Sequence, residues 1–173
     1  EQLKSCRKDG ITVVNETFSH IPPLQAIHRH DLLGVGQAVR KRLDPLRNKK
    51  FLIVSLNPDL LDEFGHYLHM DRELVTTAES LGGATLTFAS VESSFCNTEH
   101  DSWICPVLGG RTYDAIAVES PKQIRLWYSQ VVDPLRLAFR EVNSFLGPKI
   151  IYLYAGHPVY LNYIMIALRE LDS

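Results

Sequence analysis

The sequence predicts an α/β fold, with a doubly wound, mostly parallel sheet flanked by helices and preceded by an N-terminal arm and helix. Short apolar runs without polar alternation are typical of strands that are buried on both faces. They alternate with longer segments whose apolar residues recur at helical spacing, as in parallel sheets. The first strand, helix and second strand span about 39 residues, the size of one right-handed βαβ unit.

Length and composition indicate a globular protein. The 173 residues fit one domain with an extra arm, and a hydrophobic content of 45% suffices for a core. The formal charge of −2 gives no pull toward nucleic acid, so we expect no nucleic-acid partner. No apolar run approaches the roughly 18 residues of a membrane span, and no signal peptide is visible. We therefore expect a cytoplasmic protein.

The cysteines lack the spacing of a metal or redox motif. Cys6, Cys96 and Cys105 contain no CxxC pair, and we expect them to be thiols of a cytosolic protein. A bridge between Cys96 and Cys105 across an exposed loop is the alternative.

Residues 1–48 are expected to form the arm and its helix. Ile11–Val14 could be an edge strand, and Asp31 is placed to cap a helix whose apolar residues follow helical spacing until Pro45. The basic residues that follow are interpreted as a solvated helix end, favourable near the C-terminal dipole, or alternatively as a weak contact to phosphate or to a membrane surface. This basic cluster consists of Arg40, Lys41, Arg42, Arg47, Lys49 and Lys50.

Residues 49–173 are expected to form the Rossmann-like unit. Phe51–Leu56 is predicted to be a buried strand, followed by a helix from Gly65 to Leu81. Gly82-Gly83 should end that helix before a second strand, Ala84–Ala89. The remaining predicted elements are an irregular stretch over 90–111, a strand at Tyr113–Val118, a long helix from Pro121 with a kink at Pro134, a strand at Lys149–Tyr154 and a helix at Val159–Leu171.

Three strand-to-helix loops should emerge at one edge of this sheet. They cover residues 57–65, 119–121 and 155–158. In open parallel sheets, ligands bind at the carboxyl ends of the strands, where helix N-termini direct unpaired N–H groups. The convergence of these loops predicts the location of a site.

The first loop supplies most of the candidate binding residues. Asn57 and Asp59 lie directly after the buried strand, although local turn chemistry also favours Asn and Asp. Gly65 would let a ligand approach the backbone, and the amides after it could hold an anion. His66 is predicted to donate a hydrogen bond in the cleft, with a helix-start polar residue as the alternative. His66 and His69 lack a third metal ligand, so no metal site is predicted.

The later loops supply candidate catalytic residues. Glu119 and His157 each follow a buried strand, and Gly156 lies beside His157. An acid and a histidine in one cleft could transfer protons or bind sugar hydroxyls. The alternative for each is a capping or loop residue. The chain contains no GxGxxG, no GxxxxGK[ST] and no Gly-x-Ser-x-Gly motif, which argues against a dinucleotide fingerprint, a P-loop or a hydrolase elbow.

Three segments carry a resemblance to a known family. They are NPDLLDEFGHYLHMDRELVTTAESLGGATLTFAS, YDAIAVESPKQ and IIYLYAGHPVYL, within roughly residues 50–171. This stretch resembles the N-terminal, acceptor-side domain of GT-B glycosyltransferases of the GT4-like type. The histidines usual after the third predicted strand are replaced here by Ala117 and Glu119.

The resemblance implies that Gly65 and His66 line an acceptor cleft with Glu119 and His157 opposite. It implies a sugar, glycan or lipid acceptor and a nucleotide-sugar donor held by a C-terminal domain that these residues do not include. The fragment would bind no cofactor or metal and would be inactive alone. The chain does not begin with Met and stops after an apolar helical pattern, which also predicts a fragment.

Two other functions stay open. One is a Rossmann-like nucleotide-binding domain of another enzyme, which the missing glycine fingerprint disfavours. The other is a non-catalytic interaction module that retains the fold without the chemistry.

Overall fold

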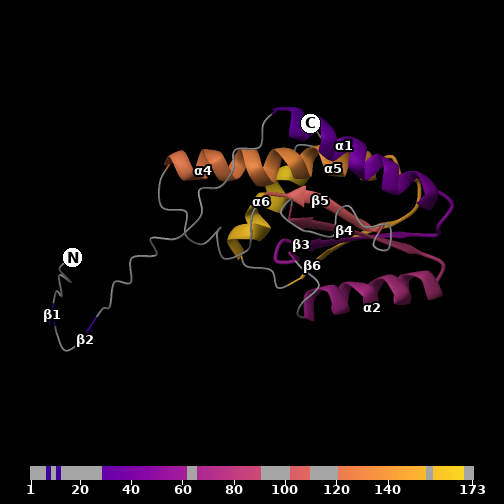
Figure 1. Cartoon of the computed structure of the whole chain (residues 1–173), viewed down its shortest axis with the longest axis horizontal. Helices are drawn as coiled ribbons and strands as arrows, with labels where there is room; N and C mark the ends of the chain where they lie inside the picture. Colours follow the sequence, from indigo (N-terminus) through magenta and orange to yellow (C-terminus); the bar gives the residue numbers. More distant parts are fainter. Residues whose placement is uncertain are drawn as a thin grey trace.

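The structure is a computed structural model that describes residues 7–8, 11–12, 29–61, 66–90, 102–109, 121–154 and 158–169. Its main part is a four-stranded parallel sheet with helices on both faces (Figure 1), which confirms the predicted α/β class. The strands are β3 (Leu52–Asn57), β4 (Ala84–Ser90), β5 (Ile104–Leu108) and β6 (Lys149–Leu153).

The strand order is β5-β4-β3-β6. From β3 the chain winds outward through β4 to β5, and it then returns to add β6 on the other side of β3, so the direction of winding reverses at the boundary between β3 and β6. β3 pairs with β4 from Leu52↔Ala84 to Asn57↔Ala89 and with β6 from Leu52↔Lys149 to Leu56↔Leu153. This reversal is the topological switch point of a doubly wound sheet.

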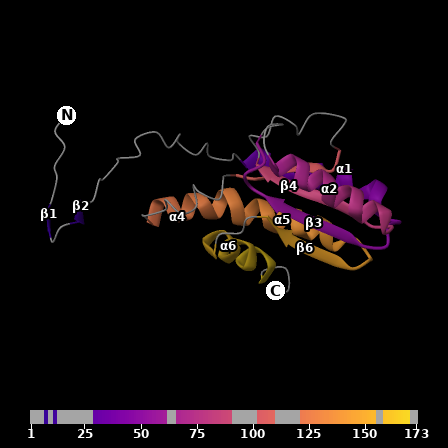
Figure 2. The same cartoon turned by 90° about the horizontal axis from the view of Figure 1, so that it is seen from below.

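Helices cover the two faces of the sheet unequally. One face carries α2 (His66–Ser80), which joins β3 to β4 and lies along both strands (Figure 2). The other face carries α1 (Arg29–Leu43), α5 (Asp133–Asn143) and α6 (Pro158–Arg169), where α5 contacts both of the others (Figure 1). The short helix η1 (Asp44–Leu46) follows α1, and α4 (Pro121–Trp127) precedes α5.

The main core lies on the α1 and α5 face. Leu52, Val54 and Leu56 of β3 are fully buried there in one cluster that also holds residues from α1, β4, α5 and α6. The other face of the same strands is polar, because Ser55 and Asn57 alternate with those leucine and valine residues. Apolar and polar side chains of β3 therefore point to opposite faces of the sheet, a pattern that the mostly apolar sequence of the strand shows only in part.

Helix α2 ends at the predicted glycines. Gly82 adopts a φ of 82°, and its N–H donates to the Glu79 carbonyl at 2.9 Å. The N–H of Gly83 donates to the Ala78 carbonyl at 2.8 Å. This pair of bonds is a Schellman motif, which needs a residue that tolerates the left-handed conformation.

The long helix changes its winding before Pro134. A turn of π-helix, η4 (Tyr128–Val132), separates α4 from α5, and the Asp133 N–H donates to the Tyr128 carbonyl five residues earlier. Proline lacks an N–H and its ring clashes with the carbonyl four residues before it, so a wider turn accommodates it. A π-turn thus stands directly before Pro134, where we expected a kink.

The third strand of the described sheet corrects one prediction. β5 lies inside residues 90–111, which we expected to be irregular, while the predicted strand at Tyr113–Val118 lies outside the described residues. Pro106 concealed β5, because proline cannot donate to a ladder and is confined to positions such as edge strands. β5 is such an edge strand, and its pairing with β4 is irregular after Ala89.

Near the N-terminus, β1 (Arg7–Lys8) and β2 (Ile11–Thr12) pair antiparallel in a separate two-stranded sheet. β2 covers the first two residues of the strand considered at Ile11–Val14, and residues 13 and 14 lie outside the described residues.

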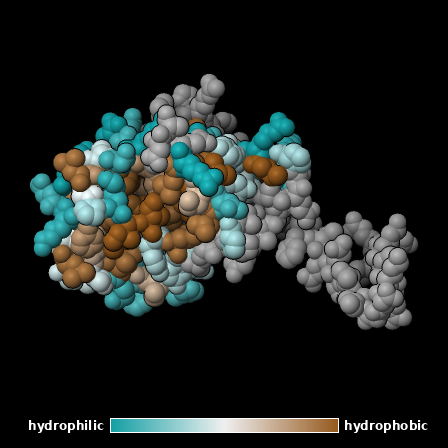
Figure 3. All heavy atoms as spheres, turned by 180° about the vertical axis from the view of Figure 1, so that it is seen from behind, coloured by the Kyte–Doolittle hydropathy of each residue, from teal (hydrophilic) through white to brown (hydrophobic). Residues whose placement is uncertain are grey.

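Apolar side chains also gather on the back of the molecule (Figure 3). The exposed large apolar residues of the described chain include Ile150, Ile151 and Tyr152 of the edge strand β6.

Candidate functional site

The switch point brings the ends of β3 and β6 together. β3 ends at Asn57 and β6 at Leu153, in parallel register and in adjacent positions of the sheet. Helices α2 and α6 begin shortly after these strands, at His66 and Pro158. Of the predicted site residues, Asn57, Asp59 and His66 are placed here. Gly65, Glu119, Gly156 and His157 lie outside the described residues, so their convergence stays a prediction.

A buried polar network lies beneath this edge. Asp71 on α2 accepts a hydrogen bond from Ser55 Oγ at its Oδ1 and one from Asn57 Nδ2 at its Oδ2, both at 2.7 Å. All three residues are at most 1% exposed. The network joins α2 to the polar part of β3 through two buried hydrogen bonds.

The electrostatic state of Asp71 follows from opposing effects. Burial raises its pKa, whereas the hydrogen bonds from Asn57 and Ser55 lower it, and burial is the larger effect. The Thr87 hydroxyl on β4 also acts to lower this pKa, although it has no hydrogen-bond partner at bonding distance. Within the described residues no basic side chain forms an ion pair with Asp71. Within the described residues, the contacts of this carboxyl group are therefore hydrogen bonds and not ion pairs.

Asp71 determines how the Asn57 amide is oriented. An ionised carboxylate can only accept hydrogen bonds, so the NH₂ group of Asn57 must face it. The amide oxygen then points away, and this Oδ1 atom is buried without a hydrogen-bond partner. A buried acceptor left in this state costs about 1–3 kcal/mol. Asn57 thus holds an acceptor ready for a donor at the carboxyl end of β3.

Aromatic rings gather beside this amide. The centroids of His66 and Tyr67 are 4.3 Å apart, and Tyr67 meets Tyr154 edge to face at 5.3 Å. His66 also lies 6.1 Å from Tyr154, and Tyr152 lies 6.4 Å from it. The rings come from the start of α2 and the end of β6, so the switch point itself assembles them.

Tyr67 and Tyr154 were not among the predicted site residues. Their positions carried a usable signal, since Tyr67 follows His66 directly and Tyr154 ends the fourth predicted strand. His66 is exposed, whereas both tyrosines are half-buried. The cluster therefore combines an exposed imidazole with two half-buried phenol rings.

Asp59 lies in a turn closed by a hydrogen bond of 3.3 Å from the Leu60 N–H to the Asn57 carbonyl. This geometry supports the turn chemistry that we considered for Asn57 and Asp59. The charge of Asp59 also acts on Tyr160 of α6. Burial, and after it this charge, raises the pKa of Tyr160 well above its ordinary value. Asp59 thus faces the helix that follows β6.

The described part of the chain also contains a groove far from the switch point. It has a volume of about 730 Å³ and lies between α1 and α2 at the amino-terminal half of β4. Sequence analysis predicted no site there, because its lining residues come from four separate segments of the chain.

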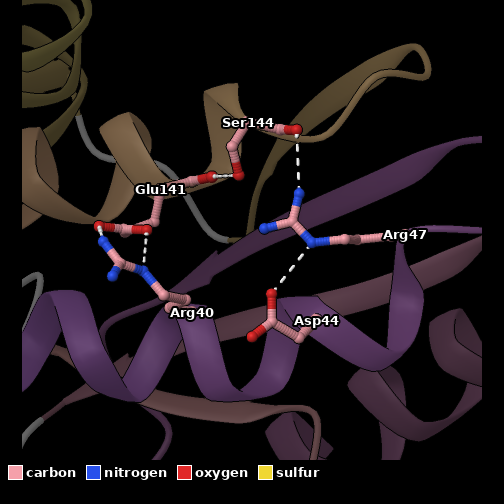
Figure 4. A network of polar contacts seen from close by, with 5 residues as sticks. All are labelled: Arg40, Asp44, Arg47, Glu141 and Ser144. Carbon is pink, nitrogen blue, oxygen red and sulfur yellow. Dashed lines mark hydrogen bonds and ion pairs between the residues drawn. The ribbon is translucent and has the colours of Figure 1, made fainter.

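Two arginines of the basic cluster, Arg40 and Arg47, form contacts that hold parts of the fold together (Figure 4). Arg40 binds both oxygens of Glu141 on α5, with Nη2 to Oε1 at 2.6 Å and Nε to Oε2 at 2.9 Å. Arg47 binds Asp44 at 3.0 Å and the Ser144 carbonyl at 3.4 Å. The hydrogen bond from Arg40 lowers the pKa of Glu141. These two arginines tie α1 and the turn after it to the C-terminal part of α5.

Other features of the described residues bear on chemistry. They contain no group of three or more His, Cys, Asp or Glu side chains placed to hold a metal ion. None of the helices in the described ranges has the length and apolar character to cross a membrane. Cys105 is buried in β5, and Cys6 and Cys96 lie outside these residues.

Comparisons of the chain with protein-family models, with curated proteins and with solved structures find no match. Function is therefore argued from the fold and from the residues at the switch point.

Proposed function

We propose that the chain is the acceptor-binding N-terminal domain of a glycosyltransferase, which moves a sugar from a nucleotide-sugar donor to an acceptor. The observation that carries this proposal is the cluster of His66, Tyr67 and Tyr154 beside the oriented amide of Asn57, at the switch point of a doubly wound sheet. The donor domain would lie outside these residues.

The chemistry of the cluster suits a sugar. Aromatic rings present flat apolar surfaces to the C–H face of a pyranose, while a few placed polar groups orient its hydroxyls. The imidazole of His66 supplies a donor or an acceptor, and the Asn57 oxygen can accept from a hydroxyl once a ligand reaches it. The resemblance of the sequence to GT-B enzymes points to the same ligand class.

Roles for the residues outside the described ranges follow from the same proposal. Glu119 and His157 would move a proton at the reacting hydroxyl, and Gly65 and Gly156 would let the acceptor approach the backbone. Asp59 would help to orient the loop. The donor nucleotide-sugar would be bound mainly by the missing domain, without a metal, so the fragment alone would have no transferase activity.

A second candidate, a nucleotide-binding domain of another enzyme, is favoured by the strand order. The reversal between β3 and β6 is the place where doubly wound folds bind nucleotides as well as other ligands. The absence of a glycine fingerprint after β3 weighs against a pyrophosphate at this position.

Saturation-transfer NMR on this chain tests both candidates. The probes are the methyl glycosides of glucose, galactose, mannose and N-acetylglucosamine, compared with UDP-glucose and NAD. We expect at least one glycoside to bind with a dissociation constant of about 1 mM, typical of a small polar ligand. His66→Ala and Tyr154→Ala should abolish the signal, whereas His69→Ala, one turn further along α2, should retain it.

Tight NAD binding with no glycoside signal would replace the first candidate by the second. Glycoside binding that survives both His66→Ala and Tyr154→Ala would show that the sugar lies elsewhere. In the full-length enzyme, wild-type turnover by the His66→Ala, Glu119→Ala and His157→Ala variants would refute the assignment of the site.

A further inference from the structure

We propose that two copies of this chain associate through β6, whose outer edges pair antiparallel about a two-fold axis at Ile151 and join the two sheets into one. The partner is a second copy of the same chain. This interface lies beside the switch point and does not depend on the glycosyltransferase proposal. It rests on the exposure of β6, on the direction of its backbone groups and on the self-complementary order of its side chains.

The strand β6 is accessible on both of its faces. It is the outermost strand on its side of the sheet (Figure 2), and among the described elements it packs mainly against β3. Ile150 is 52% exposed and Ile151 is 40% exposed, although neighbouring residues of a strand point to opposite faces of the sheet. A helix docked on one face would cover only one of these side chains, whereas a strand added at the edge flanks both.

The outward backbone groups of β6 form a regular row. The Pro148 carbonyl accepts a hydrogen bond from β3 at 2.9 Å, and the Tyr154 N–H donates to β3 at 3.2 Å. Successive residues of a strand direct their backbone groups to alternate sides, so the even-numbered residues of β6 bond to β3. No described strand lies on the other side. The N–H and C=O groups that face outward there, as a template for another strand, belong to Lys149, Ile151 and Leu153.

The two edges of the sheet differ in the features that prevent pairing. At the β5 edge, Pro106 lacks a donor and the pairing with β4 is irregular after Ala89. In contrast, β6 contains no proline and pairs with β3 in unbroken register. The charged group of Lys149 donates to the Phe145 carbonyl at 2.7 Å, in the segment before the strand. The β6 edge is therefore open to pairing, and the protected β5 edge would stop the assembly at two copies.

The order of side chains in β6 is complementary to itself. A two-fold axis at Ile151 places this residue opposite its own copy and places Ile150 opposite Tyr152 of the second copy. Lys149 then lies opposite Leu153, so the two lysines do not face each other. Aromatic and β-branched pairs stabilise neighbouring strands, whereas like charges directly opposite destabilise them. With a formal charge of only −2 per chain, these pairs favour a symmetric dimer in which each contact occurs twice.

Sedimentation equilibrium of the chain, from about 1 to about 100 µM, tests the association. We expect the mass of two copies, twice 19.6 kDa, at the upper end of this range. Ile151→Lys and Ile151→Glu each place like charges opposite each other at the axis, so each variant alone should dimerise at least about a hundredfold more weakly. An equimolar mixture of the two variants should restore the dimer, because opposite charges then meet. Leu81→Lys changes an exposed apolar residue after α2 and should leave the dimer unchanged.

Hydrogen exchange followed by NMR identifies the paired edge. In the wild-type dimer, the outward amides of Lys149, Ile151 and Leu153 should exchange at least about tenfold more slowly than the amides at the same positions in the Ile151→Lys variant. The amides of Ile150 and Tyr152 face β3 and should be protected equally in both proteins.

Several results would overturn the proposal. The wild-type chain could remain a monomer throughout this concentration range, or it could form assemblies larger than two copies. Each charge variant alone could dimerise as strongly as wild type, which would place the interface elsewhere. The mixture of the two variants could fail to associate. The Ile151 amide could exchange as fast in the wild-type dimer as in a monomer, which would exclude strand pairing.

Discussion

The side-chain amide of Asn57 donates to the carboxylate of Asp71 at 2.7 Å, although 14 positions separate the two residues in the chain. This bond joins the last residue of β3 to the second turn of α2, and it leaves the amide oxygen of Asn57 without a partner. This buried contact thus joins the helix to the sheet, and it also leaves a hydrogen-bond acceptor at the candidate site.

Removal of the Asp71 carboxylate should destabilise the fold. Asp71→Ala leaves the Ser55 hydroxyl and the Asn57 amide buried without an acceptor, and we expect a loss of about 1–3 kcal/mol in the free energy of unfolding. Urea denaturation at neutral pH measures it. Glu73→Ala, at an exposed position of the same helix, should change stability by less than about 0.5 kcal/mol.

A triple variant separates lost hydrogen bonds from lost packing. Replacing the whole network, by Ser55→Ala, Asn57→Leu and Asp71→Leu together, should recover most of the stability lost in Asp71→Ala, because no buried polar group is left unpaired. A triple variant less stable than Asp71→Ala would contradict this account.

The raised pKa of Asp71 predicts a particular pH dependence. The native state holds this proton more strongly than the unfolded state, so the stabilising contribution is complete below the unfolded pKa and is lost as pH rises through the folded pKa. The free energy of unfolding of wild type relative to Asp71→Asn should therefore fall as pH rises above the ordinary pKa of an aspartate, about 4. Glu73→Gln should show no such trend, and a difference that rises with pH would refute the dominance of burial.

The ion pair of Arg40 with Glu141 should respond in the opposite way to pH. The hydrogen bond from Arg40 lowers the pKa of Glu141, so its contribution is present above the unfolded pKa and is lost as pH falls through the folded pKa. Because the Arg40 side chain is 61% exposed, we expect Arg40→Ala to lower Tm by about 1–2 °C at neutral pH.

Calorimetry at low ionic strength and at about 1 M salt checks the origin of this effect, since the Debye length at 1 M is about 3 Å. The Tm difference between wild type and Arg40→Ala should shrink at high salt and in the Glu141→Gln background. A difference that persists in both would assign it to packing of the arginine stem.

Two glycines should respond to alanine with opposite signs. Gly82 has a φ of 82°, and an added Cβ would lie 3.1 Å from Lys50 Cδ, so Gly82→Ala should cost about 1 kcal/mol. Gly34 lies inside α1 with nothing within 4 Å of an added Cβ, so Gly34→Ala should stabilise by about 0.5–1 kcal/mol. Thermal unfolding of both variants compares them directly, and effects of equal sign would contradict the conformational argument.

The sequence predicted the positions of strands and helices correctly where local residue patterns determine them. The run at Phe51–Leu56 and the glycines after α2 both appear in the structure close to the predicted bounds, because burial periodicity and a left-handed C-cap are local properties. β5 was missed because Pro106 is typical of loops, and it is tolerated there only because the strand lies at the edge of the sheet.

The candidate site was accessible in part. The position of Asn57 after a buried strand was sufficient to predict that it lies at the carboxyl edge of the sheet. Its orientation was not, because that depends on Asp71, whose acidic side chain looks like an ordinary solvent-facing residue of an amphipathic helix. Tyr154 joins the cluster because β6 pairs with β3, and no local pattern specifies that pairing.

By itself, the sequence of this protein determined the α/β class, most of the alternation of its elements and the end of α2, since hydrophobic spacing and a glycine C-cap act over a few residues. The tertiary structure alone decided the order β5-β4-β3-β6, the partners of Asp71 and the place of β5 at the edge of the sheet. These features depend on which distant segments become neighbours, and that choice is made by the packing of whole strands and helices around a shared core.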